Sequence, residues 1–204
     1  AGGKIKIALD KTLSPADNAQ KYFKKYAKLK RTFTAVSEQK KDEENALNYL
    51  ESIRAHLNAA ENTGDLKETE DELRLLNLIK THAADRKKDK ITPFREYEKD
   101  GYKIIAGRNN ISNDRLLKSI SADDLWLHAQ GYHSSHVAVL SNGKAVPDAV
   151  LSAAAEICAY YSAGRGASKV AVDCCARRQV KKPPKANAGF VIYSGYSTVL
   201  VKPD

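Results

Sequence analysis

The chain has 204 residues, enough for one or two domains, and 34 basic residues against 25 acidic ones give it a net charge of +9, which favours a polyanionic partner. Its three cysteines, two of them adjacent, make neither a disulfide framework nor a convergent metal site, and no run of about 18 apolar residues could span a membrane. We therefore expect a cytoplasmic protein without cofactor or metal. Because methionine is absent even at position 1, we expect a piece of a longer chain.

The first segment predicts a short strand followed by a long helix. Residues 4–9 alternate weakly between polar and apolar, as in a strand. Ser14-Pro15-Ala16-Asp17 is typical of a helix start, with serine at the N-cap and proline in the first turn. Apolar residues then keep a seven-residue phase as far as Leu57, which predicts one helix over about 15–62.

A second, shorter helix is predicted over about 66–85, after a turn at residues 62–65. The two helices would form an antiparallel coiled-coil hairpin that, with a charged linker over 85–90, makes a first domain of residues 1–90. Its longer arm leaves an apolar overhang. We expect this overhang either to dock domains outside this sequence or to form a dimer through the coiled coil.

Basic residues without any acidic neighbour follow the first helix between residues 18 and 37. A solvated helix face is one interpretation, although a face of one sign suits contact with phosphates better. The members of this stripe are Lys21, Lys24, Lys25, Lys28 and Arg31.

Residues 91–204 predict a second domain of α+β class with a mostly antiparallel sheet, since strand and helix patterns alternate with short turns. Asp100-Gly101 is a strong hairpin signal. The predicted strands are 94–98, 102–106, 124–130, 137–140, 170–174, 190–193 and 198–201, and the predicted helices are 111–120 and 147–164.

The stretch from Gly107 to Val137 contains the chain's single tryptophan. If Leu125 and Leu127 face the core, strand alternation turns Trp126 and His128 the other way. An aromatic ring beside an imidazole suits stacking on, and hydrogen bonding to, a nucleic-acid base.

A second basic region contains two prolines that keep its lysines extended, and no acidic residue lies between 173 and 204. We expect nucleic-acid contact here, joined by Arg165 in a glycine-flanked loop. The basic residues of this region are Arg177, Arg178, Lys181, Lys182 and Lys185.

The ordered motifs Gly107-Arg108-Asn109-Asn110, Asn113-Asp114, Asp124–Ala129 and Ser135-His136-Val137 resemble the NFACT-R domain of the NFACT ribosome-quality-control family. The segment NAQKYFKKYAKLK resembles the family's coiled coil. The resemblance implies an RNA-binding cluster of Arg108, Asn109, Asn110, Asp124, Trp126, His128, Ser135 and His136. It also implies binding to large-subunit rRNA and tRNA, with support for C-terminal alanine tailing of stalled chains.

Alternatives remain open. Asp124 could satisfy backbone donors at a strand start, and His136 could be a buried hydrogen-bonded residue. We expect no catalysis, because the histidines lack metal-ligand or acid–base spacing. Some proteins of this family carry the label fibronectin-binding protein, so the alternative function is an adhesin for fibronectin or fibrinogen, displayed on the cell surface.

Overall fold

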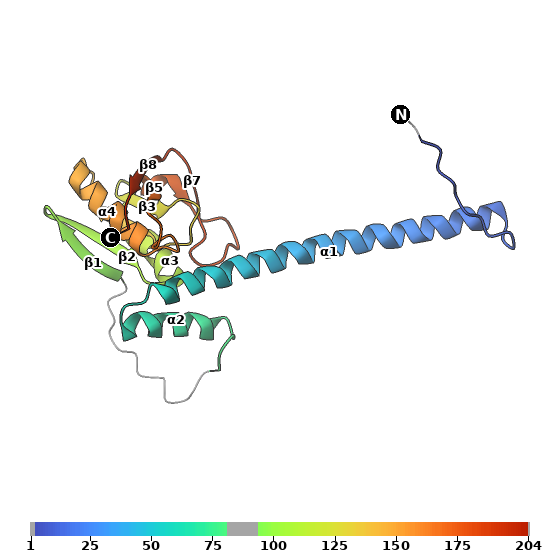
Figure 1. Cartoon of the computed structure of the whole chain (residues 1–204), viewed down its shortest axis with the longest axis horizontal. Coiled ribbons are helices and arrows are strands. Elements are labelled where there is room, and N and C mark those ends of the chain that lie inside the picture. The colour runs from blue at the N-terminus through green and yellow to red at the C-terminus, as the bar shows by residue number, and fades with distance from the viewer. Residues whose placement is uncertain (1–2, 81–93, 204) are drawn as a thin grey trace. The chain divides into compact units, whose positions relative to one another are not determined.

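The computed structural model describes residues 3–80 and 94–203, and the chain divides into two compact units, Ala1–Asn48 and Tyr49–Asp204. Figure 1 traces both units along the chain. The predicted linker over 85–90 and the last five residues of the predicted second helix lie outside the described residues. The described helices and strands confirm the expected class, a long N-terminal helix followed by an antiparallel α+β domain.

Helix α1 (Pro15–Asn58) starts where the sequence predicted. The backbone N–H of Asp17 donates to Ser14 Oγ at 3.2 Å, and that hydroxyl donates to the Asp17 carboxylate at 2.6 Å. Residues 4–9, expected as a short strand, form no strand in the structure and pair with no described strand.

The apolar seam of α1 is solvent-exposed in the first unit, with Phe33 at 75% and Tyr26 at 62% relative exposure. The sequence predicted that this seam packs in a coiled-coil hairpin. No described side chain buries it, so the hairpin stays a prediction.

Helix α2 (Thr63–Leu75) is shorter than the 66–85 predicted. Asn62 caps its start by accepting from the Asp65 N–H at 3.0 Å. At its end, Asn77 adopts a left-handed φ of 57°, and the Leu78 N–H donates to the Leu73 carbonyl at 3.0 Å. This Schellman arrangement stops the helix before the apolar pattern does.

A six-stranded, fully antiparallel sheet forms the centre of the second unit, in the order β1-β2-β4-β3-β5-β8. The predicted hairpin is confirmed, since Asp100 and Gly101 take φ of 49° and 77° between its two strands. The strands of this sheet are β1 (Phe94–Lys99), β2 (Tyr102–Gly107), β3 (Leu125–Ala129), β4 (Val137–Leu140), β5 (Val170–Ala176) and β8 (Ser197–Val201).

Helix α4 (Asp148–Tyr160) covers one face of the sheet (Figure 1). Its alanines and Val150 pack against Leu127, Val137 and Val172 in the larger hydrophobic core. Small side chains let the helix approach the strands closely, as the sequence predicted.

The opposite face carries a second, smaller core formed with α3 (Asn110–Ser119). Leu116 and Leu117 of α3 pack there on Trp126, together with Val180. Val180 belongs to a two-stranded ribbon, β6 (Val180–Lys181) and β7 (Ile192–Tyr193), that follows the 3₁₀ turn η2 (Arg177–Gln179). The strand predicted over 190–193 contains the whole of β7, and β6 was missed.

Candidate nucleic-acid interface

Trp126 is completely buried, which corrects the expectation that it lies off the core. The alternation was predicted correctly, because Leu127 and Trp126 do occupy opposite faces of the sheet. The second face, however, is covered by α3 and the ribbon. Trp126 packs on the rings of His128, His136 and Tyr193, with centroid separations of 4.9 to 5.7 Å. It therefore presents no ring face to a nucleic-acid base.

Burial also keeps the nearby histidines neutral. Burial lowers the pKa of His128 to about 4, against an opposing effect of the Asp173 carboxylate. Burial likewise holds the pKa of His136 well below its usual value, and the neighbouring His128 and His56 lower it further. His136 is buried, whereas His128 is half-buried.

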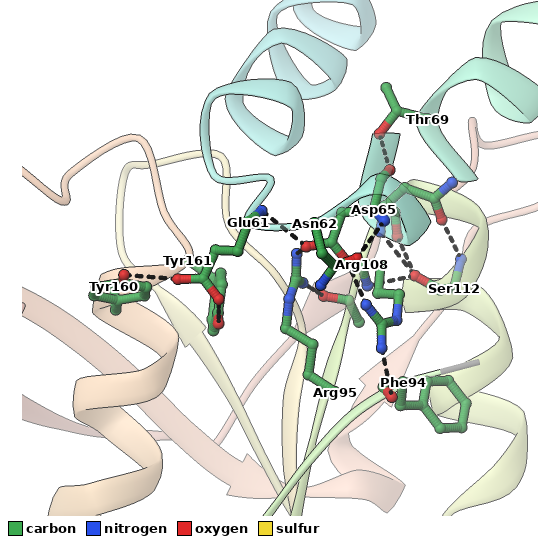
Figure 2. A network of polar contacts seen from close by, with 12 residues as sticks. Glu61, Asn62, Asp65, Thr69, Phe94, Arg95, Arg108, Ser112, Tyr160 and Tyr161 are labelled. Atoms are coloured by element: carbon green, nitrogen blue, oxygen red, sulfur yellow. Dashed lines mark hydrogen bonds and ion pairs between the residues drawn. The ribbon is translucent and has the colours of Figure 1, made fainter. Parts of the chain in front are cut away.

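Arg108, predicted to bind RNA, instead takes part in a buried ionic network (Figure 2). Asp65 at the start of α2 is 1% exposed and accepts from both Arg108 and Arg95, the latter at 2.8 Å. Burial acts to raise the pKa of Asp65. The Glu61 N–H and the charge of Arg95 outweigh burial, so the pKa lies below its usual value. The network fastens α2 to β1 and β2.

Asn109 and Asn110 extend this attachment. Asn109 caps α3 by accepting from the Ser112 N–H at 2.8 Å, and its amide donates to the Glu68 carbonyl of α2 at 2.8 Å. The Asn110 amide donates to buried Glu72 of α2 at 2.9 Å and to Ser52 of α1 at 2.8 Å. The Arg-Asn-Asn triplet thus holds helices against the sheet domain.

Gly107 precedes this triplet for a steric reason. A Cβ at Gly107 would overlap the Asn113 side chain, whose Oδ1 accepts from the His136 N–H at 2.9 Å. Glycine at this position therefore allows α3 to lie against the segment that leads into β4.

Asp124 and Ser135 are also internal. Asp124 accepts from the N–H groups of Ser121, Ser141 and Asn142 at 2.8 to 3.0 Å, as its alternative structural interpretation anticipated. Within the predicted cluster, three buried polar atoms have no hydrogen-bond partner among the described residues: Trp126 Nε1, Ser135 Oγ and His136 Nδ1. Of the eight predicted residues, six are buried and two, Arg108 and His128, are half-buried. The structure brings Trp126, His128 and His136 together.

Three residues of the second basic region, Arg177, Arg178 and Lys182, interact with other groups of the protein. Arg177 donates to the Leu117 carbonyl at 2.7 Å and to the Val180 carbonyl at 3.2 Å. Arg178 pairs with Asp123, and Lys182 pairs with Asp114, both near the surface. Lys181 and Lys185 are exposed and have no ion-pair partner among the described residues.

The ribbon places one exposed apolar side chain directly across from Lys181, and two exposed rings lie in the segments that flank β7. Ile192 lies directly across from Lys181, with Phe190 two residues before it in the chain. Phe190, Ile192 and Tyr196 are 56%, 53% and 47% exposed. The Tyr196 ring packs at 5.3 Å on Tyr193, which itself touches Trp126. The sequence analysis did not include Phe190 and Tyr196 among the candidate residues. Two aromatic residues in a basic stretch without acidic residues could have indicated them.

Two predicted basic groups lie elsewhere. The stripe Lys21, Lys24, Lys25, Lys28 and Arg31 is exposed along α1 in the first unit. Arg165 is exposed in the second unit, where its guanidinium lies 3.6 Å above the Tyr160 ring.

Known families match both parts of the chain. Residues 1–92 match the NFACT N-terminal and middle domains, and residues 90–196 match the NFACT protein RNA binding domain. The chain belongs to the NFACT family. Its residues 90–196 are therefore an NFACT RNA-binding domain, as the resemblance of its motifs predicted.

Named relatives agree with this family. The chain is 38% identical to "Rqc2 homolog RqcH" of Streptococcus pneumoniae and 35% identical to that of Bacillus subtilis, over 98% of its length in each case. It covers 36% and 35% of these relatives, so it spans about a third of their length. A solved structure of the C-terminal part of the fibronectin/fibrinogen-binding protein from Streptococcus suis superimposes with a TM-score of 0.85. It is 32% identical, and the match covers 95% of this chain and 78% of that one.

No described helix of this NFACT chain combines the length and apolarity needed to cross a bilayer. Within the described residues, no group of three or more histidine, cysteine or acidic side chains is placed to hold a metal ion.

Proposed function

We propose that this chain is the RNA-binding part of a cytoplasmic ribosome-quality-control factor. In this proposal the full-length protein binds obstructed large ribosomal subunits that still carry peptidyl-tRNA and supports C-terminal alanine tailing. The match to the NFACT RNA-binding domain and the RqcH relatives support it. The single observation that carries RNA contact is the exposure of Lys181, Lys185, Phe190 and Tyr196 within a stretch of sequence that contains no acidic residue.

We assign the contact to the surface formed by β6, β7 and their flanking loops, hereafter the ribbon surface. Lys181 and Lys185 would contact phosphates, while the exposed rings of Phe190 and Tyr196 would stack on unpaired bases. Arg178 and Lys182 could add phosphate contacts by exchanging their carboxylate partners. The stripe of Lys21, Lys24, Lys25, Lys28 and Arg31 supplies a second phosphate-binding surface.

The buried motif residues take a different role in this proposal. Arg108, Asn109, Asn110, Asp124, Trp126, His128, Ser135 and His136 would support the ribbon surface from below, without touching RNA. Trp126 is the clearest case, because it packs on Tyr193, which packs on Tyr196. The ribbon surface therefore depends on the buried cluster for its shape.

The test is binding of the chain to purified large ribosomal subunits and to tRNA across a salt series. We expect affinity to fall with salt, and the Lys181→Ala/Lys185→Ala variant to reduce the salt slope by roughly one to two units, since each phosphate contact contributes about 0.7 to 0.9. Phe190→Ala/Tyr196→Ala should weaken binding at every salt concentration.

Lys144→Ala removes a positive charge from an exposed turn and serves as the control. Wild-type affinity in both ribbon variants would refute the assignment of the ribbon surface. The Streptococcus suis relative is named for fibronectin and fibrinogen binding, so fibronectin is included as a ligand. Tight fibronectin binding together with no subunit binding would refute the quality-control proposal in favour of the adhesin.

A further inference from the structure

A cavity of about 510 Å³ lies within the second unit, away from the ribbon surface. Its walls are the last turns of α1, the loop that follows α4, and His133. This volume falls in the range of small-molecule sites, roughly 300 to 1,000 Å³. The family match assigns no ligand to it, and of the residues that line it only Arg165 was predicted from the sequence to contact nucleic acid.

The polar wall of this cavity is cationic. Arg54 reaches it from α1 and Arg165 from the loop after α4. The Arg165 guanidinium is held in place by Tyr160, whose ring it covers at 3.6 Å and whose hydroxyl it contacts. Two guanidiniums that converge on one hollow are suited to a phosphate group, because each can donate two parallel hydrogen bonds.

A carboxylate also lines this cavity. Glu51 pairs with the Arg54 guanidinium at 3.9 Å and lies 3.9 Å from His133 Nε2, so two arginines and one glutamate leave the lining with a net positive charge. The Glu61 carboxylate near Arg165 is already occupied by the hydroxyls of Tyr160 and Tyr161, at 2.7 and 2.6 Å. The arginines therefore keep donor capacity for an incoming anion.

The remaining wall suits a flat ring. Ala55, Ala59 and Ala163 contribute small apolar side chains to the lining, and Asn58 and Glu51 contribute an amide and a carboxylate. An amide and a carboxylate can pair with the donor and acceptor edge of a base. A phosphate alone would leave this apolar wall unused.

We propose that this cavity binds one nucleotide, with its phosphate on Arg54 and Arg165 and its base over the three alanines. The nucleotide comes either from an unpaired position of an RNA chain or from a free nucleoside monophosphate. The proposal does not rest on the ribbon surface, because the two sites share no residue.

The experiment is an NMR titration of the 204-residue chain with adenosine 5′-monophosphate, followed at the backbone amides of residues 162–165. Adenosine and inorganic phosphate are titrated in parallel. We expect saturable shifts with the monophosphate and at least about tenfold weaker binding of either fragment. Arg54→Ala and Arg165→Ala should each weaken binding at least about tenfold.

Ala163→Leu tests the apolar wall without removing a charge and should also weaken binding, while Lys144→Ala should leave it unchanged. Competition by a short single-stranded RNA identifies an RNA nucleotide as the source, and lack of competition identifies a free nucleotide. Absence of saturable shifts would overturn the proposal, as would equal affinity for inorganic phosphate or equal loss in Lys144→Ala. If the chain binds large ribosomal subunits but not the nucleotide, only the proposal of a nucleotide site in this cavity is refuted, and the proposed function is not.

Discussion

Two regions of the second unit were both predicted from their sequence to contact RNA, but the burial of their side chains in the fold is very different. The stretch from Gly107 to Val137 holds an arginine, asparagines, histidines and the tryptophan, and the structure buries most of them. The ribbon surface from Val180 to Tyr196 has a plainer sequence, yet it exposes lysines and aromatic rings together. The polar and aromatic motif residues of the first stretch thus lie mostly in the interior of this domain, while the surface proposed to contact RNA is distinguished by exposure and charge.

Trp126 gives the largest test of this comparison. Trp126→Ala should destabilise the chain by roughly 3 to 5 kcal/mol, the usual effect of emptying a large buried aromatic site, and RNA binding should fall only as the fold is lost. Trp126→Phe should keep both most of the stability and the RNA affinity. In the native chain, fluorescence of this single tryptophan should resist quenching by acrylamide. Efficient quenching in the folded state would contradict the buried assignment.

Asp65 tests whether the Arg-Asn-Asn triplet is structural. Asp65→Asn leaves the guanidiniums of Arg95 and Arg108 without their buried counter-ion, which typically costs about 3 to 5 kcal/mol. Urea unfolding measures the loss. Asp71→Asn, an exposed residue of the same helix, is the matched control and should change stability by less than about 0.5 kcal/mol. Equal stability of the two variants would refute the structural role.

The pH dependence of stability provides a third test of the interior. Burial lowers the pKa of His56 to about 4, against an ordinary value near 6.5 in the unfolded chain. As pH falls, this histidine takes up its proton in the unfolded chain before it does so in the folded chain. The contribution of neutral His56 to the free energy of unfolding is therefore complete above about pH 6.5 and is lost as pH falls towards 4. Glu72 has the opposite effect on stability: burial raises its pKa, so its contribution to the free energy of unfolding increases as pH falls.

We therefore expect the free energy of unfolding to fall by a few kcal/mol between pH 7 and pH 4.5. Urea unfolding across this range is the measurement. The fall should be smaller in His56→Asn, which cannot take up the proton. A free energy of unfolding that stays constant over this range would contradict a buried neutral histidine.

The sequence predicted the sheet well because its signals are local. Strand alternation placed Leu127 and Trp126 on opposite faces, and Asp100-Gly101 identified the β1–β2 hairpin. Helix ends were less predictable. The left-handed backbone at Asn77 ends α2 early, although the apolar pattern continues beyond it.

The site was less predictable because the burial of a side chain depends on segments that are distant from it in the sequence. Alternation cannot say whether the second face of a sheet meets solvent. Here that face is closed by α3 and by Val180, which lies more than fifty residues beyond Trp126. For the same reason, the partners of Arg108 and Asn110 could not be found from their neighbours, since Asp65 and Glu72 belong to a different predicted domain.

The smallest expected effect on stability belongs to the exposed rings of the ribbon surface. Phe190→Ala/Tyr196→Ala removes two exposed rings, so we expect stability to change by less than about 0.5 kcal/mol for each. The same variant should lose about 1 to 3 kcal/mol of RNA affinity for each base that stacks. Urea unfolding and subunit binding, measured on one preparation, separate the two quantities. Large destabilisation with unchanged affinity would show that these rings, like Trp126, belong to the interior that the ribbon helps to close.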